Sequence, residues 1–464
     1  MIAAVDAGCG DGRGAAVSQM TTPLRRGACP SLTAPMRTGD GLLVRLRPAR
    51  AGLAPSDWIV FARLAAAHGN GLLEVTARGN LQVRGLVESS VPKFAAALRE
   101  AGIDLHTGVA VETPPLSGVD PDEVADAGSP AAAIREAIAT CRPPLVLAPK
   151  LSILVNGGGR LDLSAMVADV RLDALRRDGA LLWRLSTGGT ARSARPIAVV
   201  AERDAVAAVL AVLEALHGLG PTARGRDVEV DALRLRLGVM ALPCEAEGAA
   251  ATPASPIGRH RFGGTDILGL GLAYGQTSAA RLEALMQGLQ ALGATEVRLA
   301  PQRALLVLGL AADRIEPAIA LAAAEGFWTR ADEPGNAIAV CAGAAGCASG
   351  HFDTKAAADL LVARAADLLD GSFTVHISGC AKGCAHPGAA ALTLAGRAGG
   401  VALVTDGRAG DATGAVVPAD ALGAAFDRLA ALHGQEKRQG DPARDVLDRI
   451  GAAALAKAFQ QDLQ

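Results

Sequence analysis

The sequence has no long hydrophobic run and no excess of either charge. None of its apolar stretches approaches the roughly 18 residues that a membrane-spanning helix needs, so no membrane partner is expected. Its 45 lysine and arginine residues are balanced by 47 aspartate and glutamate residues, which gives a net charge of -2. A broad nucleic-acid interface would need a basic excess. We therefore expect no nucleic-acid partner, and any site for a polyanion must be local.

Nucleotide-binding motifs are missing as well. The chain has neither a Walker loop nor a Gly-x-Gly-x-x-Gly stretch between a strand and a helix, and Gly157 to Gly159 lacks that spacing. Electrons for any redox reaction would therefore have to come from elsewhere. No secretory signal is apparent, and half of the eight cysteines fall in one motif, so the sequence predicts a reducing, cytoplasmic location.

The overall composition indicates a soluble globular protein. With 464 residues, of which 50% are hydrophobic and 20% charged, the chain is long enough for two or three cores. Residues 1–27 are rich in Gly and Ala and have no apolar periodicity. We expect a disordered tail there, with Met20 as an alternative start.

Two close pairs of cysteines dominate the C-terminal half. They are embedded among Gly and Ala, so that backbone amides can approach sulfur, which is typical of a soft metal centre. A structural zinc site usually has two residues within each pair, whereas five and three intervene here. The spacing favours a 4Fe-4S cluster over zinc, held by Cys341, Cys347, Cys380 and Cys384. Cys9 and Cys244 are adequately explained as small apolar side chains.

A pattern of strand, helix, strand and strand occurs twice along the chain. The helix of the first copy is expected to start near Pro55 with Ser56 as its N-cap. The duplication predicts two pseudo-equivalent α+β units that pack face to face. The expected elements are 41–47, 55–68, 72–76 and 81–85 in the first copy, and 266–272, 278–292, 296–299 and 304–308 in the second.

The cysteine motif, with the His386-Pro387 that follows it, resembles the cluster motif of the nitrite and sulfite reductase superfamily. In those reductases four cysteines hold a 4Fe-4S cluster, and the last of them also bridges to a siroheme iron. The chain resembles the precorrin-3B synthase branch of this superfamily more closely. That likeness runs from 27–50 through 74–86 to the cluster motif, and so covers nearly the whole chain apart from its tails.

The resemblance implies an α+β fold with an internal duplication, in which ferredoxin-like half-domains alternate with larger mixed α/β iron-sulfur half-domains. The implied division is a tail at 1–27, a ferredoxin-like half-domain at 28–95, a cluster-free iron-sulfur-type domain at 105–242, a second ferredoxin-like half-domain at 255–320, the 4Fe-4S domain at 326–435 and a C-terminal helix at 436–464.

The resemblance also implies a reaction. A tetrapyrrole substrate, precorrin-3A, would occupy the place that siroheme takes in the reductases. It would undergo an O2-dependent ring hydroxylation with lactone formation to give precorrin-3B, in aerobic cobalamin biosynthesis. The implied electron donor is NADH, through a separate reductase if this chain cannot bind it. Because a 4Fe-4S cluster passes electrons singly, the resemblance further suggests a mononuclear non-haem iron that activates oxygen.

Candidate substrate ligands follow from the acetate and propionate groups on such a tetrapyrrole. Arginine binds carboxylates bidentately, so fixed cations on the strands and turns are candidates. The alternative is that alternating arginines mark the solvent face of an edge strand. Arg78, whose surroundings match a family motif, and Lys150 are also the catalytic candidates. The full substrate-binding set is Arg45, Arg47, Arg78, Asn80, Gln82, Arg84, Lys150 and Arg160.

The chain departs from the reductase pattern at Ser152, where the family places a second lysine near the siroheme iron. A site that holds sulfite or nitrite through repeated protonation would be weakened by the loss of this cation. The precorrin oxygenase is therefore favoured over a siroheme-dependent nitrite or sulfite reductase. A non-catalytic iron-sulfur electron-transfer protein, or a zinc-stabilised scaffold, is a third alternative.

Ligands for a mononuclear iron are harder to find. His351 and Asp353 have the His-x-Asp spacing of a facial triad, and His376 and His386 flank the second cysteine pair. Such a short match arises easily by chance among eight histidines. We favour a surface position for His351 and a position beside the cluster for His386.

Overall fold

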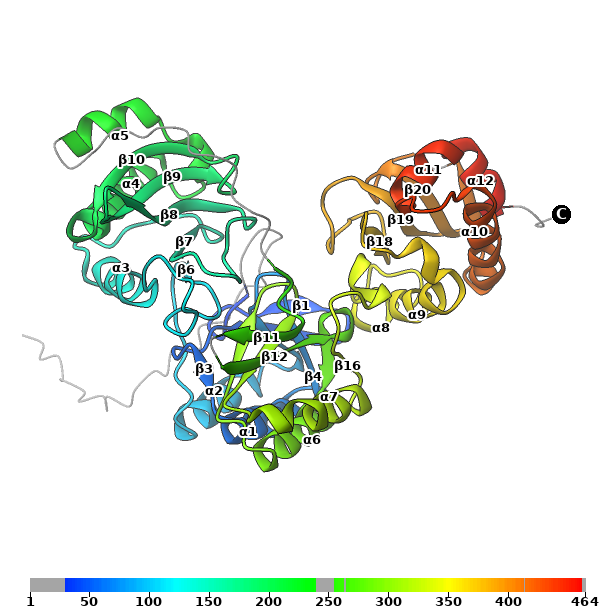
Figure 1. Cartoon of the computed structure of the whole chain (residues 1–464), viewed down its shortest axis with the longest axis horizontal. Helices are drawn as coiled ribbons and strands as arrows, with labels where there is room; N and C mark the ends of the chain where they lie inside the picture. The colour runs from blue at the N-terminus through cyan, green and yellow to red at the C-terminus, as the bar shows by residue number, and fades with distance from the viewer. Residues whose placement is uncertain (1–29, 239–253, 263, 413, 461–464) are drawn as a thin grey trace, which may run out of the picture.

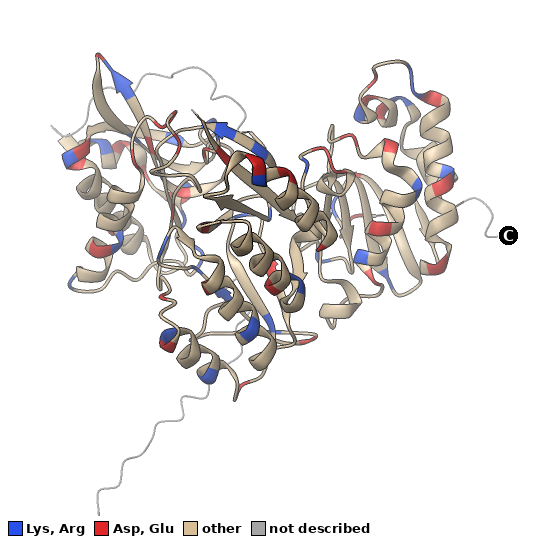
Figure 2. Cartoon of the chain, turned by 60° about the horizontal axis from the view of Figure 1, so that its bottom comes forward, with Lys and Arg blue, Asp and Glu red and all other residues tan. Residues whose placement is uncertain are grey.

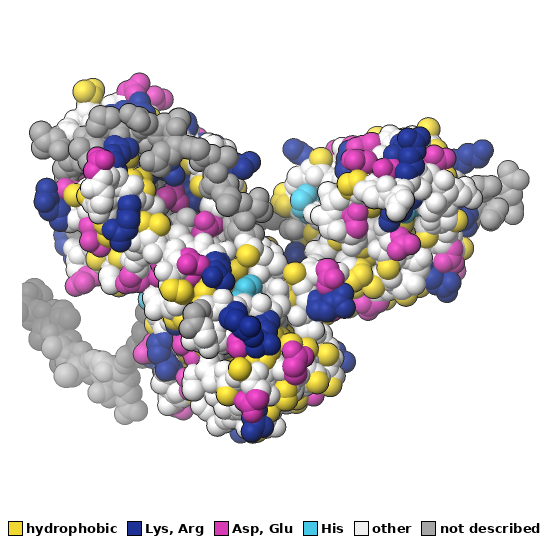
Figure 3. Space-filling view, viewed as in Figure 1, with side chains coloured by type: hydrophobic (Ala, Val, Ile, Leu, Met, Phe, Trp, Pro, Cys, Tyr) yellow, Lys and Arg dark blue, Asp and Glu magenta, His cyan; other side chains and the backbone are white. Residues whose placement is uncertain are grey.

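The computed structural model describes residues 30–238, 254–262, 264–412 and 414–460. The predicted tail at 1–27, Met20, Cys9 and Cys244 lie outside these ranges. The described chain forms three domains, and the two larger ones stand on either side of a central ferredoxin-like domain (Figure 1). In the space-filling view a notch separates the two larger domains (Figure 3).

The central domain contains two sheets of closely related design. The first has the order β1 (Met36–Thr38), β2 (Gly41–Leu46), β5 (Leu81–Leu86), β4 (Leu72–Val75), β13 (Gln276–Ser278), and is covered by α1 (Pro55–His68) and α2 (Val91–Glu100). The second has the order β11 (Gly258–Phe262), β12 (Thr265–Leu272), β15 (Ala304–Leu308), β14 (Glu296–Ala300), β3 (Gly52–Leu53), with β16 (Phe327–Trp328) also on β12, and is covered by α6 (Ala279–Ala291) and α7 (Ile315–Ala324).

Each half of the duplication gives a short strand to the sheet of the other. β3 pairs with β14 in the second sheet, and β13 pairs with β4 in the first. The helices α1 and α6 pack together, and the indole of Trp58 donates to the carbonyl of Val297 at 3.1 Å. Apolar side chains of both halves therefore form one core, as the predicted face-to-face packing requires.

The helices α1 and α6 begin in different ways. Ser278 caps α6, since its side chain accepts from the amide of Arg281. Ser56 was wrong as the cap of α1, because Ala54 occupies that position and makes no side-chain bond. Pro55 explains the shift: its fixed backbone angle suits the first helical position, which leaves Ser56 inside the helix.

The two larger domains share one sheet plan, in which three parallel strands are followed by two antiparallel ones. The first contains β6 (Ala110–Glu112), β7 (Ser152–Asn156), β8 (Ala168–Arg177), β9 (Ala180–Gly189) and β10 (Arg195–Ala201), in spatial order. The second contains β17 (Ile338–Val340), β18 (Val375–Ser378), β19 (Ala390–Arg397), β20 (Gly400–Gly407) and β21 (Ala415–Val417) in the same arrangement.

Helices lie along these sheets, and each sheet has its own core. The first domain has α3 (Gly128–Thr140), α4 (Ala205–Leu219) and α5 (Val230–Leu237), and the second has α8 (Gly343–Gly346), α9 (Thr354–Ala365), α10 (Leu422–Glu436), α11 (Ala443–Ile450) and α12 (Ala452–Gln460). The single C-terminal helix expected from the sequence is wrong. Gly451, at φ 78°, separates α11 from α12, because that left-handed backbone interrupts a helix.

Charged residues of both signs are interspersed over the three domains (Figure 2). Within the described ranges, no helix combines the length and apolarity that crossing a bilayer would demand.

Candidate active site

A cavity of about 500 Å³ lies between the central domain and the first larger domain. It is bounded by the end of β2, the turn between β4 and β5, the edge of β14, and the segment that follows β6. Among the described residues that line it, one carboxylate, Glu112, faces four guanidinium groups and an imidazole. These basic residues are Arg47, Arg50, Arg78, Arg135 and His106. The cavity is therefore suited to an anionic ligand.

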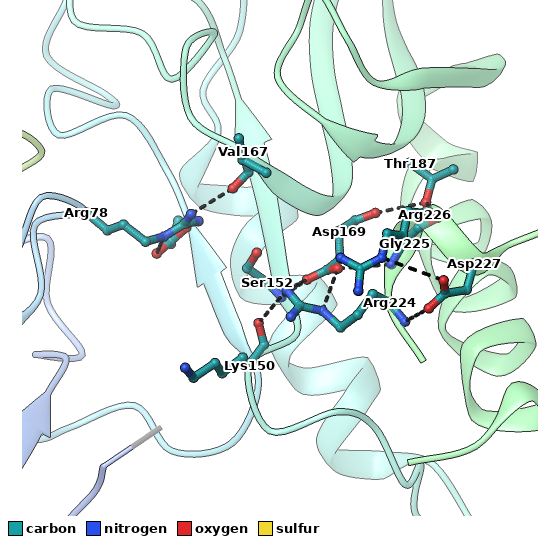
Figure 4. Close-up of polar contacts among 11 residues, drawn as sticks. Arg78, Lys150, Ser152, Val167, Asp169, Thr187, Arg224, Gly225, Arg226 and Asp227 are labelled. Atoms are coloured by element: carbon teal, nitrogen blue, oxygen red, sulfur yellow. Dashed lines mark hydrogen bonds and ion pairs between the residues drawn. The ribbon is translucent and has the colours of Figure 1, made fainter. Parts of the chain in front are cut away.

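Arg78 projects from the tight turn between β4 and β5. Gly79 allows this turn for two reasons. Its φ of 77° is a left-handed conformation that glycine adopts without strain, and a Cβ at this position would clash with the backbone of Ala300. The Arg78 guanidinium donates to both carboxylate oxygens of Glu112, at 3.0 Å through Nε, and to the carbonyl of Val167 at 2.7 Å (Figure 4). Arg78 is thus held at the cavity wall by the first larger domain.

Arg135 and His106 also line the cavity, and no pattern in the sequence pointed to either residue. Arg135 donates to the carbonyl of Val111 at 2.7 Å, and burial together with nearby Arg47 lowers the pKa of its guanidinium. Burial, then Arg135 and Arg47, likewise lower the pKa of His106, so this imidazole is neutral near pH 7. Such mutual repulsion among cations is relieved when an anion binds between them.

The structure brings only some of the predicted substrate ligands to this cavity. Arg47, Arg78 and Asn80 line it. Arg45, Gln82, Arg84, Lys150 and Arg160 lie elsewhere. Their positions show that alternation along a strand predicted a shared face correctly but did not predict which neighbour would cover that face.

Arg45 and Gln82 belong to a polar row across the first sheet. The register places Arg45 opposite Gln82, Gln82 opposite Glu74, and Glu74 opposite Gln276. With its amide oriented to suit both neighbours, Gln82 donates to Glu74 at 2.9 Å and accepts from Arg45 at 2.9 Å. The row lies on the sheet face opposite the helices, because Val44, Leu73 and Val83 occupy the apolar core.

Arg160 joins the first larger domain to the second ferredoxin-like sheet. Its guanidinium pairs with Asp122 at 2.7 Å, donates to the carbonyl of Arg261 at 2.8 Å, and lies 4.6 Å from the ring centre of Phe262. These contacts stabilise a domain boundary. They account for Arg160 without a substrate.

Lys150 and Ser152 lie at the start of β7 (Figure 4). Lys150 is exposed, and its amino group has no partner within the part of the chain that the structure describes. The Ser152 side chain is buried, and its amide donates to Asp169 at 3.0 Å. Figure 4 shows the Lys150 side chain turned away from Asp169, on the side from which Arg78 comes.

Asp169 already has a cation. Arg224 donates to both of its carboxylate oxygens, at 2.9 and 2.8 Å, and the amide of Gly225 adds a third bond. Burial alone would raise the pKa of Asp169, but these bonds more than offset burial and lower it. The Asp169–Arg224 ion pair lies beside Ser152, at the position where the reductases would have their second lysine.

The four cysteines of the motif lie in two loops at one edge of the second larger sheet. Cys341 follows β17 and Cys380 follows β18, and these are neighbouring parallel strands. Cys347 ends α8, and Cys384 is the most exposed of the four. No group of three or more His, Cys, Asp or Glu side chains in the described ranges is yet placed to hold a metal ion.

The thiols nevertheless fit a sulfur-ligated cluster by their chemistry. The amide of Gly379 donates to the sulfur of Cys341 at 3.1 Å, which is the kind of bond that stabilises a thiolate. Beside the second loop, His376 is fully buried with both ring nitrogens unpartnered among described residues. Burial and then His386 lower the pKa of His376 to about 4, so it is neutral at physiological pH.

The His351 and Asp353 pair is explained by ordinary structure. Asp353 is the N-cap of α9, and its carboxylate accepts from the amides of Lys355 and Ala356 at 3.0 and 3.1 Å. The His351 side chain is exposed. These positions agree with the interpretation favoured from the sequence.

Comparisons with known proteins place this geometry in a family. Residues 34–101 match the nitrite/sulfite reductase ferredoxin-like half domain. The precorrin-3B synthase of Sinorhizobium sp is 46% identical over 444 residues, which cover 94% of this chain and 95% of the relative. The chain belongs to the precorrin-3B synthase family. It is therefore an enzyme.

More distant relatives connect this family to the wider superfamily. The chloroplastic ferredoxin–nitrite reductase of Oryza sativa subsp. japonica is 24% identical over 360 residues, covering 70% of this chain and 60% of that relative. The solved structure of the Mycobacterium tuberculosis NirA protein superposes with a TM-score of 0.68 at 18% identity, covering 89% of this chain and 84% of that one. The predicted fold, an α+β chain of the nitrite/sulfite reductase type, is confirmed.

Proposed function

We propose that this protein converts precorrin-3A to precorrin-3B by an O2-dependent ring hydroxylation with lactone formation, in aerobic cobalamin biosynthesis. The observation that carries the proposal is the 46% identity to a precorrin-3B synthase over 94% of the chain. One oxygen atom of O2 enters the product and the other leaves as water, so two electrons are consumed. We infer NADH as their source, through a separate reductase.

The cationic cavity supports a substrate rimmed with carboxylates. Arg47, Arg78 and Arg135 would bind acetate or propionate groups of the tetrapyrrole, and neutral His106 would serve as a hydrogen-bond partner. Lys150, exposed at the start of β7, would reach a carboxylate from the first larger domain. Cys341, Cys347, Cys380 and Cys384 would hold a 4Fe-4S cluster, which supplies single-electron transfer when bound.

Glu112 gives a specific reason to prefer a large substrate over a small oxyanion. The Glu112 carboxylate accepts a hydrogen bond from Nε of Arg78 at 3.0 Å, so one side of this guanidinium already has an anionic partner. Sulfite or nitrite would have to displace that carboxylate or lie next to its negative charge, which costs binding energy in a shielded site. A macrocycle can instead present a carboxylate to a neighbouring arginine while its rings fill the rest of the cavity.

The decisive experiment is anaerobic purification followed by incubation with precorrin-3A, reductant and O2. We expect formation of the hydroxylated lactone, with a broad brown absorption and no siroheme bands. Siroheme bands with sulfite or nitrite reduction, and no conversion of precorrin-3A, would establish the reductase alternative. Iron and sulfide without either activity would establish an electron-transfer protein, whereas equimolar zinc without sulfide would indicate a scaffold.

Arg78 and Glu112 provide the residue-level test. Arg78→Ala should weaken precorrin-3A binding about 10- to 100-fold, since a charge-assisted bond contributes about 1.5–3 kcal/mol. Glu112→Gln, which removes the competing charge, should leave binding equal or tighter. Arg37→Ala is the control, because Arg37 pairs with Glu88 at an exposed position outside the cavity. Unchanged binding in Arg78→Ala, measured by titration, would remove Arg78 from the site.

A further inference from the structure

We propose that Arg84 is a positioning residue for the cluster ligand Cys347, so that the first ferredoxin-like sheet forms part of the cluster site. The proposal rests on the 4Fe-4S cluster inferred above. It replaces the substrate-binding role that the sequence suggested for Arg84.

Arg84 bonds directly to the turn that carries Cys347. Its Nη2 donates to the carbonyl of Gly346 at 2.6 Å, and Gly346 is the residue before Cys347 at the end of α8. The Arg84 side chain is only 5% exposed. Arg84 does not line the cavity described above.

Two carboxylates fix the Arg84 side chain from behind. Asp40 accepts from Nε at 2.9 Å and from Nη2 at 2.7 Å, and Glu74 accepts from Nη1 at 3.4 Å. Asp40 is itself held by Thr38 at 2.8 Å and Asn70 at 2.9 Å. The guanidinium is therefore rigid before the cluster turn reaches it, as a positioning group must be.

A second contact comes from the same turn of the central domain. Gly39, which precedes Asp40 between β1 and β2, packs against the backbone of Cys347 and Ala348. A methyl group on Gly39 would lie 2.5 Å from the Ala348 nitrogen and 2.8 Å from the Cys347 Cα. The backbone of the first half-domain thus touches the cysteine itself, independently of Arg84.

The polar row connects this support to the substrate side of the sheet. Glu74 accepts from Arg84, from Gln276 at 2.9 Å and from Gln82 at 2.9 Å, and Gln82 also contacts Arg45. Glu74 is therefore bonded to Arg84 of the cluster support and, through Gln82, is linked to Arg45 near the end of β2. Because the two carboxylates would be left without their cation, removal of Arg84 should also cost stability, and the test must separate the two effects.

The test uses the full-length chain, purified anaerobically, with iron and acid-labile sulfide measured per folded chain together with the EPR spectrum of the reduced protein. Arg84→Gln should lose at least half of its iron and sulfide or show displaced EPR lines. Arg84→Lys should recover part of both. Arg171→Gln is the matched control: Arg171 is fully buried in the first larger domain, where it pairs with Asp173 and donates to the carbonyl of Met166.

We expect Arg171→Gln to lower the melting temperature without loss of cluster per folded chain. Gly39→Ala leaves every charge in place and should reproduce the cluster loss, so it decides the matter if Arg84→Gln does not fold. Full iron and an unchanged EPR spectrum in Arg84→Gln or Gly39→Ala would overturn the proposal. Equal cluster loss in Arg171→Gln would also overturn it, as a general effect of stability. Wild-type protein without iron and sulfide would instead refute the cluster itself.

Discussion

The two larger domains use one sheet plan to hold a pair of loops, but by different chemistry. In the first domain, segments 113–127 and 157–167 follow β6 and β7. In the second domain, the loops 341–353 and 379–389 follow β17 and β18. A backbone contact between the two loops occurs in both domains. The amides of Val124 and Ala125 donate to the carbonyl of Gly157, and the backbone amide of His351 donates to the carbonyl of Gly379.

The difference lies in what completes each pair of loops. In the first domain Asp120 accepts from the amide of Arg160 at 2.6 Å, so the protein supplies its own connection. In the second, the corresponding place has thiols, with Gly379 donating to the sulfur of Cys341 at 3.1 Å. The proposed cluster would therefore do in the second domain what acids and amides do in the first. The first domain shows how protein groups alone can join two such loops.

The largest effect is expected from removing one thiol. Cys384→Ser should abolish cluster binding and turnover, because three cysteines and a hydroxyl bind a 4Fe-4S cluster poorly. Cys141→Ser, at the end of α3 in the cluster-free domain, is the control and should keep both. Iron, sulfide and activity assays check this. A Cys384→Ser protein with full iron, sulfide and activity would show that the ligands are assigned wrongly.

Removal of the cluster from the wild type should affect only one of the two loop pairs. Segments 341–353 and 379–389 should lose hydrogen-exchange protection, since sulfur no longer joins them, whereas 113–127 and 157–167 should keep theirs. Exchange measured by mass spectrometry before and after chelation provides the comparison. An equal loss of hydrogen-exchange protection in both domains would show that the cluster does not support the loops of the second domain alone.

The helix starts give a smaller and matched effect. Asp126 accepts from the amides of Gly128 and Ser129 at the start of α3, as Asp353 does at the start of α9. Asp126→Ala and Asp353→Ala should each lower the free energy of unfolding by about 1 kcal/mol. Iron content should be unchanged in both variants. Loss of iron in Asp353→Ala alone would instead identify Asp353 as a metal ligand.

The remaining effect depends on pH and concerns Asp169 in the first domain. The pKa of Asp169 is lowered in the folded state, so its stabilising contribution is present above its unfolded pKa of about 3.9 and lost as the pH falls through the lower folded value. Asp169→Asn should therefore be less stable than the wild type at pH 7, by about 1–3 kcal/mol. The difference in free energy of unfolding between Asp169→Asn and the wild type, measured by denaturation, should shrink as the pH falls below about 4. A constant difference down to pH 2 would exclude ionisation as the cause.

The sequence predicted those parts of the molecule that depend on local periodicity. Alternation placed Val44 and Leu46 in the core and Arg45 on the opposite face, and the repeated strand and helix pattern identified both ferredoxin-like halves. The short strands β3 and β13 have no such signal, since two or three residues show no period. Their exchange between the sheets could be seen only in the structure.

The sequence predicted that arginines would line the site, but it did not predict which arginines these would be. Arg84 lies on β5 and Arg47 directly follows the neighbouring strand β2, yet Arg84 faces Gly346 from a different domain, while Arg47 lines the cavity. Glu112 lies 34 residues from Arg78, and nothing local connects the two. Contacts of this kind depend on how domains pack, which no spacing rule reports.

The exchanged strands have a consequence during synthesis. β4 is flanked by β13, and Glu74 finds its partner Gln276 only 202 residues later in the chain. At about 5–20 residues per second, the ribosome needs on the order of 10–40 s to deliver that strand. Until then, the free edge of β4 presents unpaired amides and carbonyls to any other extended segment. The nascent chain is thus most open to mispairing while its first larger domain is being made.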